Sequence, residues 1–222
     1  MRKYCAEFIG TFVLVFLGTG TVAIANTGET AIGYLGIGLA FGLAVTIMAF
    51  AVGGVSGENF NPVVSLAMML NKRLKVRDGI FYLIAQFLGA IAASGILSIF
   101  IHALGLPKDG FGQTDFPNIT AGQAFLFEAT ITFLFVFVIL MVTSKKYGNA
   151  SLAPITIGLA LAFLIIIALN LTGGSLNPAR SFGPAIFAGG SALARYWVYL
   201  LAPLVGSAIA SFAAKFMGSE EV

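Results

Sequence analysis

The chain carries the run SGENFNPV at residues 56–63 and the related run GGSLNPARS at residues 173–181. Each run interrupts an intensely apolar sequence, and its asparagine–proline pair, Asn61-Pro62 or Asn177-Pro178, opens a short apolar stretch. Asparagine is a good helix N-cap and proline suits the first helical position, so each pair predicts the start of a helix. One such pair is an ordinary cap, whereas two copies in matching surroundings form a specific pattern.

The two predicted helices are too short to cross a membrane. The first would run from Pro62 to about Leu70, and the second from Pro178 to about Phe187. At roughly 1.5 Å per residue each is about 15 Å long, half of a hydrocarbon core of about 30 Å. Two half-spanning helices whose positive ends lie inside the membrane indicate a pore or a transporter.

The composition is that of a membrane protein. Of the 222 residues 59% are hydrophobic and only 9% are charged, and the mean hydropathy is +0.98. Soluble domains carry about 25% charged residues, which excludes that class. Long apolar runs without alternation favour helices over a barrel. The net charge of +3 does not indicate a nucleic-acid partner, since the basic residues lie in short loops, and the single Cys5 excludes an intrachain disulfide.

Six full spans can be marked, at about 7–25, 33–53, 80–104, 122–143, 152–171 and 195–216. If they alternate across the membrane, one side receives most of the basic residues, namely Arg2, Lys3, Lys72, Arg73, Lys75, Arg77, Lys145, Lys146 and Lys215. The opposite side receives only Lys108 and Arg195. By the positive-inside rule both termini are expected in the cytoplasm, in a multi-pass protein of the plasma or inner membrane.

The two halves of the chain resemble each other. Residues 6–12 (AEFIGTF) resemble residues 127–133 (FEATITF), and one asparagine–proline run follows in each half. Three spans per half is an odd number, so the second copy must be inverted in the membrane. We therefore expect repeats at about 1–104 and 122–222, joined by an extracellular loop at 105–121, with half-helices that enter from opposite faces and meet at the midplane.

This arrangement resembles the major intrinsic protein family, the aquaporins and glycerol facilitators, and most closely its prokaryotic aquaporins. The resemblance covers nearly the whole chain and rests on the two runs quoted above and on the paired glutamates Glu7 and Glu128. It implies an all-α membrane protein with six transmembrane helices and two re-entrant half-helices, forming a single channel domain over residues 1–222. It also implies a homotetramer with one pore per subunit. No cofactor and no metal ion are expected.

The resemblance assigns the pore centre to the two motifs Asn61-Pro62-Val63 and Asn177-Pro178-Ala179. The asparagine amides can donate to a passing water molecule, while apolar walls offer it few other partners. The positive helix ends on both sides oppose protons and cations. Val63 stands where the family usually has alanine, and it should add bulk beside the meeting point of the half-helices.

Arg180 lies one turn into the second half-helix, where a charged side chain is costly and usually functional. In the resembling family this arginine stands at the outer constriction, with Phe41, Ile165 and Gly174 at the other filter positions. Water-selective members typically have histidine at the position of Ile165. Glycerol facilitators typically have a bulky aromatic at Gly174 and tryptophan at Phe41, so this filter fits neither type. Its opening is expected to be wider and more apolar than that of a strict water pore.

Four further polar residues lie near these motifs. Asn59 stands where water channels often carry histidine, and it is expected either to line the inner vestibule or to bond the loop backbone. Glu58 beside it is expected to be solvated or paired in the cytoplasmic mouth, with a gate as the alternative. Glu7 and Glu128 are expected to accept backbone N–H bonds from the re-entrant loop of their own half, because irregular backbone at depth needs such partners. A proton relay through these two acids is the alternative.

The sequence therefore favours a passive channel for water that excludes protons and ions. Small uncharged solutes such as glycerol, hydrogen peroxide or ammonia are further candidates, and Ser181, Ala185 and Tyr199 follow the water-channel pattern. The alternatives are an aquaglyceroporin with glycerol as its main solute and an ion-coupled secondary transporter, which also uses inverted repeats and broken helices. An enzyme is not expected, because the chain shows no Ser–His pair, metal-ligand cluster or paired acids at helical spacing.

Overall fold

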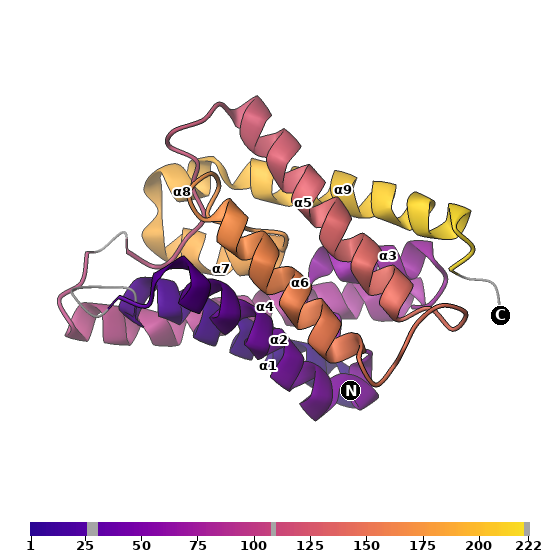
Figure 1. Ribbon diagram of the computed structural model, residues 1–222. Helices are drawn as coiled ribbons and strands as arrows, with labels where there is room; N and C mark the ends of the chain where they lie inside the picture. The colour runs from indigo at the N-terminus through magenta and orange to yellow at the C-terminus, as the bar shows by residue number, and fades with distance from the viewer. Residues whose placement is uncertain (26–30, 108–109, 220–222) are drawn as a thin grey trace.

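The computed structural model describes residues 1–25, 31–107 and 110–219, and within these ranges the regular structure is all helical, with no strand. In chain order the elements are α1 (Arg2–Gly20), the π-helical turn η1 (Thr21–Ala25), α2 (Gly33–Ser56), α3 (Pro62–Leu70), α4 (Val76–Ala103), α5 (Ala121–Val142), α6 (Ala153–Ala168), α7 (Pro178–Ala188), α8 (Gly190–Ala194) and α9 (Tyr196–Phe216). Figure 1 shows the long helices side by side in one bundle, with the short helices α3 and α7 toward opposite ends of it.

An apolar helix lies at each of the six predicted spans, but only five of the described helices are long enough to cross a membrane. Within the described ranges, α1 with η1, α2, α4, α5 and α9 are long and apolar enough to cross a membrane, and α6 is an apolar helix of 16 residues. The expected span 152–171 therefore ends early. Three successive N–H groups, those of residues 171–173, converge on the carbonyl of Ala168. This tight turn directs the chain back toward the second asparagine–proline run.

The spanning helices pack in pairs, α1 against α4, α5 against α9 and α2 against α6. The contact between α2 and α6 depends on two glycines that face each other. A Cβ atom at Gly42 or at Gly158 would press on the backbone carbonyl of the other residue. The absence of side chains at these positions lets the two backbones approach closely, as is common between membrane helices.

The half-helices α3 and α7 begin as predicted and end within one residue of the expected positions. Asn61 Oδ1 accepts the N–H of Val63 at 3.0 Å. Asn177 Oδ1 accepts two N–H groups, those of Ala179 at 3.0 Å and Arg180 at 3.2 Å. Each asparagine thus caps its own helix through bonds that reach only two or three residues along the chain.

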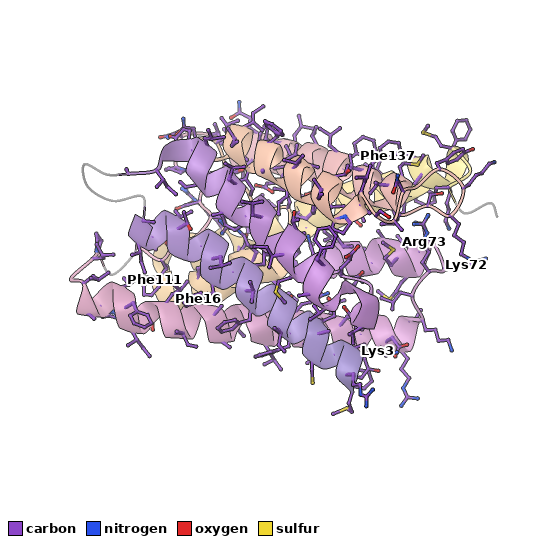
Figure 2. All side chains as sticks on the ribbon, turned by 60° about the horizontal axis from the view of Figure 1, so that its bottom comes forward. Lys3, Phe16, Lys72, Arg73, Phe111 and Phe137 are labelled. Atoms are coloured by element: carbon purple, nitrogen blue, oxygen red, sulfur yellow. The ribbon has the colours of Figure 1, made fainter. Side chains whose placement is uncertain are left out.

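The two ends of the bundle differ in charge. Lys3, Lys72 and Arg73 lie toward one end, which we call the basic end, and Phe111 lies toward the other, which we call the loop end (Figure 2). At the basic end Lys3 Nζ lies 2.7 Å from Asp78 Oδ2 and ties the start of α1 to α4. The start of α1 and the end of α9 both lie here (Figure 1). The bundle therefore has a basic face and an opposite face, as a membrane protein of fixed orientation requires.

Candidate functional site

The N-termini of α3 and α7 are tied together at the centre of the bundle. Asn61 Nδ2 donates to the backbone oxygen of Leu176 at 2.8 Å, and Asn177 Nδ2 donates to the backbone oxygen of Phe60 at 3.0 Å. Each asparagine therefore binds the loop that precedes the other half-helix. A side-chain amide has two N–H groups, and one acceptor for each amide is recorded among the described residues. The second N–H group of each asparagine remains available to a small molecule.

The backbone makes this meeting point electropositive. Aligned peptide dipoles place roughly half a positive charge at the N-terminus of a helix. Both α3 and α7 direct that end toward the same region, since their caps bond across to each other's loops. The centre of the bundle thus carries a positive potential before any ionised side chain is counted.

A buried glutamate holds each loop that precedes a half-helix. Glu7 accepts the backbone N–H groups of residues 59–60 at 3.1 and 2.7 Å, and Glu128 accepts those of residues 175–176 at 3.0 and 3.1 Å. Both glutamates are completely buried. Loop backbone at this depth has no water to bond, so the two carboxylates supply the acceptors that it needs.

Both loops contain residues in the left-handed conformation directly before the capping asparagine. Phe60 has φ 49° and Leu176 has φ 52°, values that residues other than glycine rarely adopt. The carbonyls of these two residues are the ones that accept the bonds from the opposite asparagine. The unusual backbone geometry therefore accompanies the cross-connection between the two halves.

A narrow cavity passes this meeting point. It leaves about 30 Å³ for the centres of water molecules, so it admits water but is tightly confined. Seven of the residues singled out from the sequence line it: Phe41, Glu58, Asn59, Asn61, Ile165, Asn177 and Arg180. The cavity thus joins the capping asparagines to residues of the predicted filter.

Apolar helix faces that the sequence did not single out form much of the remaining wall. The lining positions recur every four residues: Phe135 and Ile139 on α5 with Thr143 directly after it, and Ile157 and Leu161 on α6 with Ile165, the one that the sequence had singled out. Residues four apart share one face of a helix, so this spacing was the signal available in the sequence. It could not be used, because both helices are apolar on every side and no contrast marks the inward face.

Arg180 lies at the loop end of the cavity. Its Nη1 donates to the backbone oxygen of Gly112 at 3.2 Å, and its guanidinium carbon lies 4.7 Å from the centre of the Phe41 ring. Such a distance allows a cation–π interaction. The side chain is 2% exposed, and Nε has no hydrogen-bond partner among the described residues. The sequence showed no nearby acid, but Glu128 is close enough to act on Arg180 electrostatically.

Five residues of the predicted motifs and filter do not line the cavity: Pro62, Val63, Gly174, Pro178 and Ala179. A Cβ atom at Gly174 would lie 2.9 Å from Ile165 Cδ1 and 3.2 Å from Ala168 Cβ, so neighbouring side chains already fill that space. The space beside Gly174 is therefore occupied by Ile165 and Ala168, and the expected wider opening stays a prediction. Val63 is completely buried in the apolar core. Its neighbour Val64 lines the cavity instead.

The segment between α4 and α5 supports Arg180 from outside. Gly112 supplies the carbonyl described above, and Asp115 accepts hydrogen bonds from Ser191 and from Arg195 Nη1, the latter at 2.7 Å. Burial opposes ionisation of Asp115, but these hydrogen bonds and the charge of Arg195 outweigh it and lower the pKa of Asp115. The carboxylate therefore fastens the segment that carries Gly112 to the chain next to α9.

At the basic end the narrow cavity meets a wider one. The second cavity leaves about 330 Å³ for the centres of water molecules, and it shares Glu58 and Thr143 with the first. Asn59 beside Glu58 lines the narrow cavity and donates from Nδ2 to Ser65 Oγ at 3.0 Å. Burial and the nearby Glu7 raise the pKa of Glu58. Glu58 thus lies at the junction between a confined and an open space.

The chain and its fold match known proteins over nearly their full length. The model of the major intrinsic protein family matches residues 1–214. The glycerol uptake facilitator protein-like 6 of Lactiplantibacillus plantarum is 62% identical over 100% of both chains, and Aquaporin Z of Brucella melitensis is 43% identical over 94% of both. The X-ray structure of the aquaglyceroporin from Plasmodium falciparum is 28% identical and has a TM-score of 0.87, covering 97% of this chain and 96% of that one. The chain therefore belongs to the major intrinsic protein family of passive membrane channels.

Proposed function

We propose that this channel conducts water and small uncharged solutes and excludes protons and ions. The observation that carries the proposal is the pair of capped half-helices whose N-termini meet beside one narrow cavity, with Arg180 at its loop end. Two positive helix ends and a guanidinium oppose protons and cations. The apolar wall leaves a water molecule few partners other than the asparagine N–H groups, so passing molecules are oriented at the centre.

Water is the main solute in this proposal, with glycerol, hydrogen peroxide and ammonia as further ones. The small free volume of the cavity favours water. The rival is a channel with glycerol as its main solute. It is favoured by the apolar Ile165 and by two similar proteins, one called a glycerol uptake facilitator protein-like protein and one an aquaglyceroporin. Aquaporin Z among the relatives supports the first alternative.

The proposed architecture is one channel domain over residues 1–222, made of two inverted repeats at about 1–104 and 122–222. The matching glutamate bonds and the reciprocal asparagine bonds support it. The basic end would face the cytoplasm by the positive-inside rule, with both termini there and the segment 105–121 outside. The plasma or inner membrane is the proposed location. A homotetramer with one pore per subunit remains a proposal based on the family.

An ion-coupled transporter would use the buried acids differently. A proton relay needs carboxylates that exchange partners, whereas both oxygens of Glu7 and of Glu128 accept backbone N–H bonds. These bonds favour a supporting role for the two acids. A protonophore tests the point, because it would abolish proton-coupled flux and leave channel flux unchanged.

Stopped-flow light scattering of proteoliposomes tests the proposal directly. Fast shrinkage under an impermeant osmolyte, compared with protein-free liposomes, is the expected result for water. A glycerol gradient in the same preparation then gives the ratio of glycerol to water permeability. Water flux no faster than in protein-free liposomes would contradict the proposed function, and glycerol flux that dominates the ratio would favour the rival.

A further inference from the structure

The positive groups along the narrow cavity account for the rejection of cations but not for the rejection of anions. Two helix N-termini and Arg180 repel cations, but the same groups attract anions, since a helix N-terminus is a favourable place for negative charge. A channel for neutral solutes must therefore also reject small anions. A negative charge near the path could do this.

Glu58 is the acidic residue in the wall of this cavity, and no second acid lines it in the part of the chain that the structure describes. Arg180 at the loop end and Glu58 at the basic end are the charged side chains of the same wall. Glu58 also lines the wider cavity at the basic end, together with Lys145. A solute that passes between the two cavities therefore passes close to Glu58.

The backbone at Glu58 is unfavourable for a glutamate. Its φ of 53° lies in the left-handed region, where glycine would be accommodated more easily. The carboxylate lies against Gly53, and within residues 1–25, 31–107 and 110–219 no hydrogen bond or ion pair to it is recorded. The side chain is only partly exposed. Glu58 thus combines an unfavourable conformation, a carboxylate without a recorded partner and a place in the walls of both cavities, which suggests a functional reason for the residue.

We propose that Glu58 is a specificity-determining residue of the channel, and that its carboxylate rejects small monovalent anions at the basic end of the conduit. The proposal rests on the proposed function, because it concerns which solutes enter the same cavity. Arg180 and the helix ends reject cations, and Glu58 rejects the anions that those groups would attract. Neutral hydrogen-bond donors pass both charged ends.

The ionisation of Glu58 gives the proposal a pH signature. Burial and the charge of Glu7 both raise the pKa of Glu58, so it becomes neutral at a higher pH than an exposed glutamate does. Lys145 is the other charged residue that lines the wider cavity. Protonation removes the repulsion, so anion permeability should rise as the pH falls from neutral toward mildly acidic values. Nitrate suits the test because it stays ionised throughout this range.

The experiment measures nitrate and water permeability in proteoliposomes that contain the full chain. A choline nitrate gradient drives anion entry, which a potential-sensitive dye reports, and light scattering gives water permeability in the same vesicles. Glu58→Gln preserves shape and removes the charge. Glu58→Gly removes the charge and relieves the left-handed conformation, so it guards against a folding defect. Glu58→Asp keeps the charge. Asp78→Asn is the matched control, because Asp78 is an acidic residue at the basic end that bonds to Lys3 and Tyr4 and lines neither cavity.

We expect the nitrate-to-water ratio to rise about tenfold in Glu58→Gln and Glu58→Gly, the order of magnitude for repulsion between two partly desolvated charges. Glu58→Asp and Asp78→Asn should keep the ratio of the unmodified chain. The ratio of the unmodified chain should rise on acidification, and that of Glu58→Gln should not. An unchanged ratio in both charge-free variants would overturn the role of Glu58. Absence of water flux in the unmodified chain would instead overturn the proposed function.

Discussion

The two re-entrant segments, residues 56–70 and residues 173–188, have similar backbones and different charges. Each has a left-handed residue before its asparagine, a half-helix that begins with proline, and a buried glutamate that accepts two loop N–H groups. The first segment carries Glu58 and the second carries Arg180. The shared features form the meeting point of the half-helices. The differing residues give the two ends of the narrow cavity opposite charges.

The second segment is also the more firmly bonded of the two. Asn177 caps two N–H groups where Asn61 caps one. Ser181 Oγ donates to Ser175 Oγ at 2.7 Å and accepts from Thr114 Oγ1 at 2.9 Å, which joins this half to the segment between α4 and α5. We infer that the segment bearing Arg180 needs a more rigid support, because a guanidinium fixed across a narrow cavity must keep its position.

The largest expected effect comes from removing either loop-holding carboxylate. Glu7→Ala and Glu128→Ala each leave two buried backbone N–H groups unpaired, at about 1–3 kcal/mol per group. Both variants should therefore lose about 3 kcal/mol of unfolding free energy, measured by titration with a denaturing detergent. A variant that tolerates the change within about 1 kcal/mol would show that its half has another source of support.

Alanine substitution of the two capping asparagines should destabilise the protein to different extents. Asn177→Ala removes bonds to two N–H groups and should cost about 2 kcal/mol, against about 1 kcal/mol for Asn61→Ala. Both should lower water permeability, since both remove a donor from the cavity. Asn149→Ala is the matched control, because Asn149 Oδ1 caps residues 151–152 away from the cavity. Asn149→Ala should reduce the stability of the protein and leave its water permeability unchanged. Equal losses at Asn61 and Asn177 would remove this difference between the halves.

A histidine at position 165, in the predicted filter, should make the channel more selective for water over glycerol. Ile165→His adds a hydrogen-bond donor and a ring to the wall that also contains Phe41 and Arg180, so the glycerol-to-water permeability ratio should fall about tenfold. Ile165→Leu keeps the wall apolar and should change the ratio little. The same light-scattering assay measures both. A ratio unaffected by histidine would refute the assignment of Ile165 to the filter.

The smallest effect is expected from the ion pair outside the second segment. Asp115→Asn removes the negative charge that pairs with Arg195, and a partly exposed ion pair of this kind contributes about 0.5 kcal/mol. Because the folded-state pKa of Asp115 is lowered, this contribution is present above the ordinary aspartate pKa of about 3.9 and is lost as the pH falls below it. The difference in thermal stability between the unmodified chain and the variant should therefore vanish in strong acid. A difference that persists at low pH would contradict the ionic origin.

Much of the fold followed from local sequence signals, and so did part of the site. Each asparagine–proline pair specified a helix start through bonds within three residues, and the long apolar runs specified the spans. The tight turn on the carbonyl of Ala168 was placed too late: Gly173, with φ 75°, closes it, but no glycine or proline among residues 169–172 marks the end of α6. The sequence also did not predict that Ile165 and Ala168 occupy the space beside Gly174, because such a contact depends on tertiary packing.

The sequence by itself determined where helices begin, which segments cross the membrane, and that two short helices bear matching caps. These properties depend on hydropathy and on capping, which act along a few consecutive residues. Only the tertiary structure decided that each asparagine bonds the opposite loop, which faces of α5 and α6 line the cavity, and that Glu58 and Arg180 share one wall. Those relations join residues about 120 positions apart, and uniformly apolar helices carry no local mark of the partner they will meet.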